Sequence, residues 1–164
     1  MAAEYSANAT QVVQPNQATI FTESPVPCNK GLVFHRDESG IFLLANNAPA
    51  NTNNCSCGCR RIYETLYQVE FHGNISLPEE PAGTVEPISL AIAIGGENDP
   101  SSIMTVTVPL VSDTAGDNVG ASIIVAVPSL CGCQSISVRN ISTQAINVMN
   151  ANIVINYIGI RRVR

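Results

Sequence analysis

Cysteine is the residue type whose spacing in this sequence could do chemistry. Five of the six cysteines fall in two tight clusters of C-x-C spacing, namely Cys55, Cys57, Cys59, Cys131 and Cys133. Zinc sites more often use C-x₂₋₄-C pairs, so these clusters are atypical zinc ligands. Cysteines this close together are poor disulfide partners for each other. Three interpretations stay open: unpaired structural thiols, disulfides between the clusters, and a thiolate metal site. We expect no bound metal and no other cofactor.

Other reactive side chains give little sign of catalysis. Cys28 and His35 could form a nucleophile and base pair, although a loop cysteine and a hydrogen-bonded histidine explain them as well. Glu79 and Glu80 lie between prolines in an expected loop, which indicates solubility rather than acid–base chemistry. The acidic turn residues lack the D-x-D-x-D-G spacing of a calcium loop. We therefore expect that the chain is not an enzyme.

The elements that carry these residues are predicted to be strands. Residues 63–77 alternate between a dry face and a wet face, and the dry positions include Tyr67, Val69, Phe71 and Ile75. Further strands are expected at residues 18–22, 31–35, 40–44, 87–94, 103–110, 120–127, 133–140 and 145–158. No window shows the apolar period of a helix. The sequence therefore predicts an all-β, antiparallel sandwich or barrel.

Composition excludes several classes of protein. The chain has 164 residues, enough for one domain, with 45% hydrophobic and only 13% charged residues and a formal net charge of −5. No basic stripe is present to neutralise phosphates, so we expect no nucleic acid partner. No apolar run reaches the roughly 20 residues needed to cross a bilayer, so we expect no membrane partner. The first residues lack the pattern of a signal peptide, and we expect synthesis in the cytoplasm.

Two expected strands carry apolar or small side chains on both faces. This pattern is not typical of an antiparallel strand that faces water on one side. Cover by a loop of the same chain is one explanation. Because the charge content is low, a contact between subunits is favoured. The expected interface residues are Leu90, Ala91, Ile92, Ala93, Ile124 and Ala126.

The order of these patterns resembles a known family. Five segments carry the resemblance: His35-Arg-Asp-Glu-Ser-Gly-Ile-Phe-Leu-Leu44, the strand Tyr63–Leu77, the strand and turn at 88–96, the Ile136–Asn140 stretch with Ser142, and the strand 151–158. They are similar to the successive strands of tumour-necrosis-factor/C1q-like jelly rolls. The branch in question includes exosporium tip domains and bacteriophage virion proteins. The resemblance implies a ten-strand jelly roll that assembles as a homotrimer. No collagen-like repeat precedes the domain, unlike in many members.

The resemblance also implies an organisation and a role. Residues 1–16 are expected to form an N-terminal arm, and residues 17–164 the jelly-roll domain. The expected function is that of a capsid decoration protein, bound as a homotrimer to the major capsid protein on the outer surface of a bacteriophage virion and made in the host cytoplasm. The residues expected to contact the capsid are Glu4, Tyr5, Arg161, Arg162 and Arg164.

An alternative function shares the same fold. A fibre-tip or spore-surface jelly roll would act in attachment or receptor binding. A carbohydrate-binding head would need clustered exposed aromatic residues, and the sequence has only four Tyr and four Phe, mostly at expected core positions. The sequence therefore favours decoration over attachment.

Overall fold

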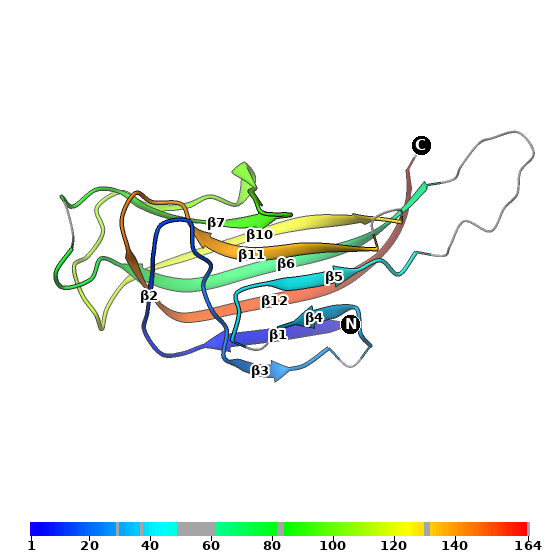
Figure 1. The fold of residues 1–164 in the computed structure, drawn as a ribbon, viewed down its shortest axis with the longest axis horizontal. Coiled ribbons are helices and arrows are strands. Elements are labelled where there is room, and N and C mark those ends of the chain that lie inside the picture. Colours follow the sequence, from blue (N-terminus) through cyan, green and yellow to red (C-terminus); the bar gives the residue numbers. More distant parts are fainter. Residues whose placement is uncertain (29, 37, 49–61, 82–83, 130–131, 164) are drawn as a thin grey trace, which may run out of the picture.

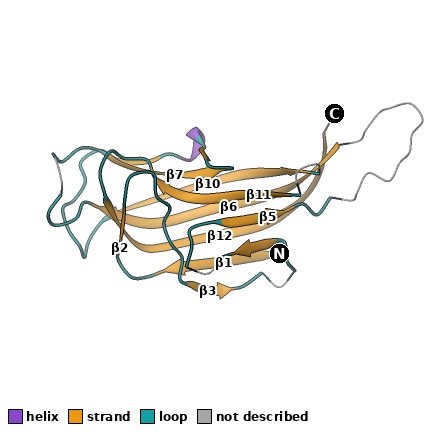
Figure 2. Ribbon diagram, viewed as in Figure 1, coloured by secondary structure: helices purple, strands orange, loops and turns teal. Residues whose placement is uncertain are grey.

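Two antiparallel β-sheets make up the architecture. The structure, a computed structural model, describes residues 1–28, 30–36, 38–48, 62–81, 84–129 and 132–163. These residues form twelve strands and one short 3₁₀ helix, η1 (Pro100–Ser102). Figures 1 and 2 show the long strands running along the molecule, with the connections gathered mainly at the ends. The predicted all-β, antiparallel sandwich is confirmed.

Sheet A contains the longest strands. Its order is β10 (Asp117–Pro128), β6 (Ile62–Ser76), β12 (Ile146–Val163), β1 (Ala2–Ala7) and β3 (Glu23–Val26), with β2 (Gln11–Val13) also paired to β12. The alternation predicted for residues 63–77 is confirmed in β6, where Tyr67, Val69 and Phe71 are buried and the residues between them are partly exposed. A period of two places alternate side chains on opposite faces of a strand. β6 therefore contributes one face to the core and one to the surface.

Sheet B is built from shorter strands. Its order is β4 (Val33–His35), β5 (Phe42–Ala45), β11 (Cys133–Asn140), β7 (Ile88–Ile94) and β8 (Glu97–Asn98), with β9 (Met104–Val106) also paired to β7. The inner faces of the two sheets meet in one hydrophobic core. Aromatic rings join the layers: the ring of Phe42 lies 4.9 Å from that of Tyr5 and 5.4 Å from that of Phe21.

The N-terminal segment differs from the expected arm. Residues 2–7 form β1, which lies between β12 and β3 in sheet A, and residues 11–13 form β2. Within β1, Ala3, Tyr5 and Ala7 are all buried. Burial of these apolar side chains favours pairing in the sheet over a free arm. In the structure, residues 1–16 are thus part of the sandwich.

The double apolar character of β7 arises inside one chain. Leu90 and Ile92 point into the core, and Ala91 and Ala93 on the opposite face are also fully buried. Arg139 is paired with Ala91 across the ladder, and side chains of such a pair share a face. These four residues have no surface left for a second subunit. The expectation that Leu90, Ala91, Ile92 and Ala93 line an interface is wrong, because their own chain covers them.

Candidate interaction surfaces

The outer face of sheet A is a broad surface built from rows of paired residues. We call it the open face. The register of β10, β6, β12 and β1 places side chains side by side in three successive rows. The rows are Ile124–Gln68–Asn156–Ala2, Ser122–Glu70–Val154–Glu4 and Gly120–His72–Asn152–Ser6. No lysine or arginine lies in these rows, so the open face combines amides, hydroxyls and a few apolar side chains with two carboxylates.

Both carboxylates of the open face are already paired with neighbouring amides. The Asn152 amide donates to Glu4 Oε1 at 2.7 Å, and the Gln68 amide donates to Glu70 Oε1 at 2.6 Å. Burying a carboxylate is costly unless hydrogen bonds compensate for the lost water. These internal hydrogen bonds lower the free-energy cost of burying the open face against a partner. Among the asparagines of β12 on this face, Asn152 therefore has a defined partner.

The apolar part of the open face is centred on β10, the edge strand. Ile124 is 65% exposed and Ala126 is half-buried, so two of the six expected interface residues do lie at the surface. Leu66 is the cross-strand partner of Ala126, and Val154 lies two strands away in the adjoining row. Asp117 is the one charged residue of β10, and a solvent-exposed isoleucine on such a long edge strand is the kind of feature that natural sheets protect.

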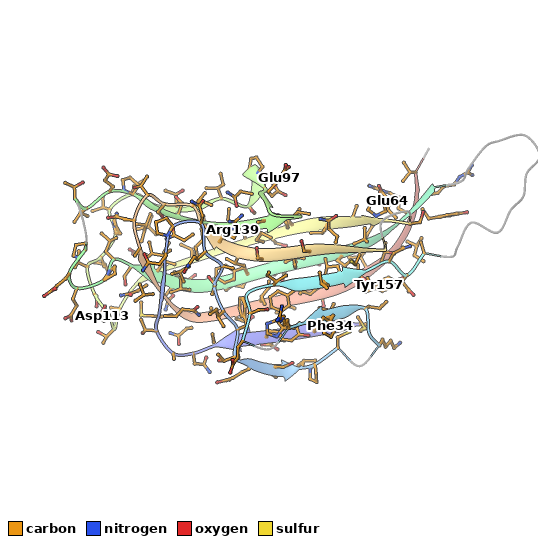
Figure 3. All side chains as sticks on the ribbon, in the orientation of Figure 1. Phe34, Glu64, Glu97, Asp113, Arg139 and Tyr157 are labelled. Atoms are coloured by element: carbon orange, nitrogen blue, oxygen red, sulfur yellow. The ribbon has the colours of Figure 1, made fainter. Side chains whose placement is uncertain are left out.

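The residues expected to contact a capsid differ in their exposure and in their partners. Tyr5 is 5% exposed and packs against Phe42 and His35 in the core, so it is not available to a partner. Glu4 is half-buried on the open face. Arg161 makes an ion pair of 2.6 Å with Glu64 at the C-terminal end of the molecule, where Figure 3 labels Glu64.

Of the other two arginines in the C-terminal tail, one lies among the described residues. Arg162 is exposed on the last residues of β12. Arg164 lies outside the described residues. Within the described part of the tail, only Arg161 therefore has a fixed ionic partner.

The structure describes only one of the five clustered cysteines, Cys133. Cys55, Cys57, Cys59 and Cys131 lie outside the described residues. Cys133 is exposed at the start of β11, and neither it nor Cys28 forms a disulfide within the described residues. The three interpretations of the clusters therefore all remain open predictions.

Cys28 occupies a distinctive backbone environment. Its Sγ atom accepts a hydrogen bond from the Val33 amide at 3.3 Å. Burial acts to raise the pKa of this thiol, but the backbone N–H groups of residues 30–33 stabilise the thiolate and leave the pKa below its usual value. His35 does not pair with it, because His35 Nε2 bonds the Ser39 carbonyl at 2.9 Å. A nucleophile and base pair is thus not assembled.

Buried tyrosines near the same thiol are held neutral. Burial raises the pKa of Tyr67 to about 12, with smaller contributions from Cys28 and Tyr157. Burial also raises the pKa of Tyr5. The Tyr67 hydroxyl donates to the carbonyls of Ala45 and Leu32, so it joins β6 to sheet B. Its role is in packing the two sheets together.

In the part of the chain that the structure describes, no three His, Cys, Asp or Glu side chains gather closely enough to hold a metal ion. None of the helical structure found there is long and apolar enough to cross a bilayer.

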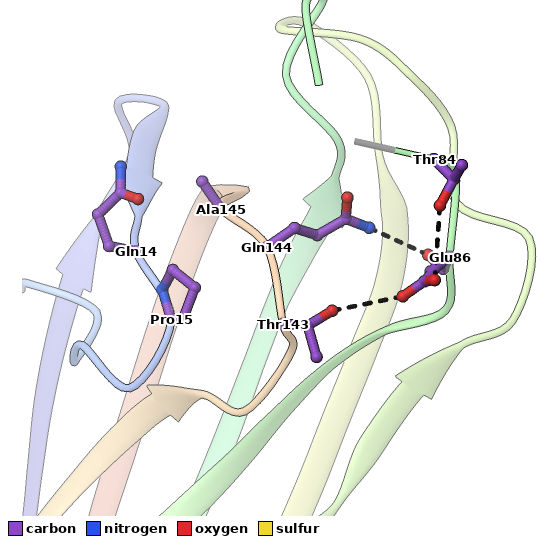
Figure 4. Close-up of a pocket in the computed structure, with 7 residues that line it drawn as sticks. All are labelled: Gln14, Pro15, Thr84, Glu86, Thr143, Gln144 and Ala145. Carbon is purple, nitrogen blue, oxygen red and sulfur yellow. Dashed lines mark hydrogen bonds between the residues drawn. The ribbon is translucent and has the colours of Figure 1, made fainter. Parts of the chain in front are cut away.

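An open cavity, lined largely by polar residues and not predicted from the sequence, lies at one end of the sandwich. Its volume is about 390 Å³, and three connecting segments, distant in sequence, form its walls (Figure 4). The lining residues are Gln14, Pro15, Thr84, Glu86, Thr143, Gln144 and Ala145. No pattern within any one segment could indicate it, because the fold alone brings the three segments together.

Comparison with known proteins places the fold. No known protein family matches the sequence, and no curated protein matches it either. Among solved structures, the globular domain of zebrafish complement 1qA aligns at a TM-score of 0.58 and 12% identity, covering 99% of this chain and 98% of that one. The Eiger TNF of S. frugiperda aligns at 0.61 and 10% identity, covering 97% and 92%. The chain thus has the tumour-necrosis-factor/C1q-like jelly-roll fold that its sequence motifs resemble.

Proposed function

We propose that this chain is a virion structural protein that assembles as a homotrimer and decorates the outer surface of a bacteriophage capsid. In this role it is a non-catalytic protein, made in the host cytoplasm, and its partner is the major capsid protein. The fold supports a self-associating module, although fold alone does not define function. The role in the capsid rests on the size, low charge and sequence motifs of the chain.

The observation that carries the trimer is the exposed Ile124 on the edge of the open face. This side chain is 65% exposed, and it lies beside amides and carboxylates that are hydrogen-bonded to one another. No lysine or arginine lies in the three rows. Apolar surface rimmed by polar groups is typical of protein interfaces. A second copy of the chain fits such a surface, because it can supply both an apolar edge and amides for hydrogen bonding.

Sedimentation tests the assembly. We expect a single species with three times the chain mass of 17.4 kDa at micromolar concentration. A stable single chain under these conditions would remove the support for the trimer.

The copy number in purified particles tests the role. Mass spectrometry should find on the order of hundreds of copies per particle for a protein that covers a closed shell of symmetric units. A handful of copies would instead indicate the second candidate, an attachment head at a fibre tip or spore surface. That candidate is favoured by one observation, the polar cavity at the end of the sandwich.

A further inference from the structure

The cavity at the end of the sandwich has walls that are fixed by buried hydrogen bonds. The fully buried Asn140 amide donates to the carbonyls of Val13 at 2.9 Å and Gln144 at 2.8 Å, so it ties the wall after β2 to the β11–β12 connection. Ser142 Oγ accepts from the Ser89 amide at 2.7 Å, which ties the same connection to β7. Two of its three walls are therefore held to the sandwich before any ligand arrives, which lowers the cost of binding.

Hydrogen-bonding capacity inside the cavity is largely unused. The Glu86 carboxylate accepts from the hydroxyls of Thr84 and Thr143, but both contacts are 3.4 Å long (Figure 4). Hydroxyl hydrogen bonds are normally 2.5–3.0 Å, and a carboxylate can accept about four of them. The Gln144 amide reaches only the Glu86 carbonyl, also at 3.4 Å. A ligand hydroxyl could therefore make shorter, charge-assisted bonds with Glu86.

The remaining walls decide what kind of ligand fits. The Gln14 side chain makes no hydrogen bond with the described residues, so its amide can both donate and accept. Pro15 and Ala145 supply small apolar surfaces. Among the described residues that line the cavity, none is a lysine, arginine or histidine and Glu86 alone is charged, so the site would repel an anion. Mixed donors, acceptors and apolar patches suit a neutral molecule rich in hydroxyl groups.

From this geometry we propose that the cavity binds a neutral, hydroxyl-rich ring, namely a single hexose unit of a glycan. Its volume of about 390 Å³ lies at the small end of the usual range for ligand pockets. Glu86 accepts from ring hydroxyls, the amides of Gln14 and Gln144 bond the neighbouring oxygens, and Pro15 and Ala145 contact the apolar C–H face. The apolar contact in this site comes from Pro15 and Ala145 rather than from an aromatic ring.

Chemical-shift perturbation with three matched sugars tests this site. The probes are methyl glucoside, which is neutral, glucuronate, which is anionic, and glucosamine, which is cationic at neutral pH. We expect saturable shifts at Thr84, Thr143 and Gln144 with methyl glucoside and a dissociation constant on the order of 1–10 mM, as for other very small ligands. Glucuronate should bind at least about tenfold more weakly, because its charge meets Glu86.

Two matched variants locate the binding. Glu86→Gln keeps the shape of the side chain and removes its charge, so we expect affinity for methyl glucoside to fall by about tenfold. Glu97→Gln makes the same change at an exposed glutamate of β8 outside the cavity and should leave affinity within about twofold. The spectrum of each free variant reports whether it is folded.

Several results would overturn the proposal. One is the absence of saturable shifts up to about 100 mM methyl glucoside in the folded protein. Others are equal binding by Glu86→Gln, or binding of glucosamine without methyl glucoside. The measurement needs neither a trimer nor a capsid. Its failure would leave the decoration role intact, and a failed sedimentation test would leave the sugar site intact.

Discussion

The guanidinium of Arg139 holds the backbone carbonyl of Asn16, with Nε at 3.1 Å and Nη2 at 2.6 Å from that oxygen. Its remaining Nη1 donates to the Gly96 carbonyl at 2.8 Å. One side chain thus joins the turn after β2 to the β7–β8 turn, close to the middle of the sandwich where Figure 3 labels it. Arg139 is thus one of the residues that hold the N-terminal segment against sheet B.

Replacing Arg139 by alanine should therefore destabilise the fold. We expect the free energy of unfolding to fall by about 1–3 kcal/mol, because two carbonyls lose charge-assisted donors. Urea denaturation at equal chain concentration measures the change. Arg162→Ala removes an exposed arginine and should alter stability by less than about 0.5 kcal/mol. Equal stability of the two variants would contradict the assigned role of Arg139.

A charge at the edge of the open face should prevent self-association. Ile124→Asp places a carboxylate where the proposed interface needs an apolar side chain, and burying an unpaired charge is strongly unfavourable. We expect sedimentation of this variant as a single folded chain.

The matched control for this variant is Val108→Asp. Val108 is 81% exposed in a loop away from the three rows of the open face, so its replacement should leave the assembly unchanged. If both variants form the same oligomer as the original chain, the interface lies elsewhere.

Alkaline pH should weaken the fold through Tyr67. Because the pKa of this hydroxyl is raised to about 12 from its usual value of 10.0, the folded state keeps its proton where the unfolded chain loses it. The contribution of Tyr67 is complete below pH 10 and is lost as the pH rises toward 12. The slope from this one group is at most about 1.4 kcal/mol per pH unit.

Tyr67→Phe isolates that contribution. The variant should be less stable at neutral pH by roughly 1 kcal/mol, because the hydrogen bond that the hydroxyl shares between the carbonyls of Ala45 and Leu32 is lost. Its stability should then fall less steeply between pH 10 and 12. Parallel pH curves for the two proteins would show that Tyr67 does not cause the loss.

Cys28 should react as a thiolate at unusually low pH. The backbone N–H groups of residues 30–33 keep its pKa below the usual value, so the thiolate persists to lower pH than in a free cysteine. Peptide mapping after brief alkylation over a pH series gives the midpoint for this residue. In urea the midpoint should return to that of an ordinary cysteine, since the folded backbone provides the effect.

Sequence patterns predicted the sheets better than they predicted the surfaces. The alternation in residues 63–77 identifies β6 because one face is wet and the other dry. In β7 the prediction of a subunit interface was wrong. Ala91 and Ala93 are small enough to be covered by neighbouring strands and by Arg139 of their own chain. A second apolar face therefore does not distinguish cover by a partner from cover by the chain itself.

Short segments were harder to assign than long ones. Tyr5 belongs to a strand of only six residues, too short for its alternation to stand out from the flanking sequence. The strand expected at residues 18–22 is instead reduced to an isolated bridge between Ala18 and Arg139, and β3 begins at Glu23. The end cavity could not be found at all, because its walls meet only after folding.

The two edges of sheet A have unlike character, which limits how copies of the chain can join through it. β3 ends the sheet with Pro25, which has no amide hydrogen to offer an incoming strand, and Pro27 follows directly. β10 ends the opposite side with twelve residues and a protruding isoleucine. A contact that used β10 of both copies would be two-fold and would close after two chains, so a trimer must set β10 against a different surface of the next copy.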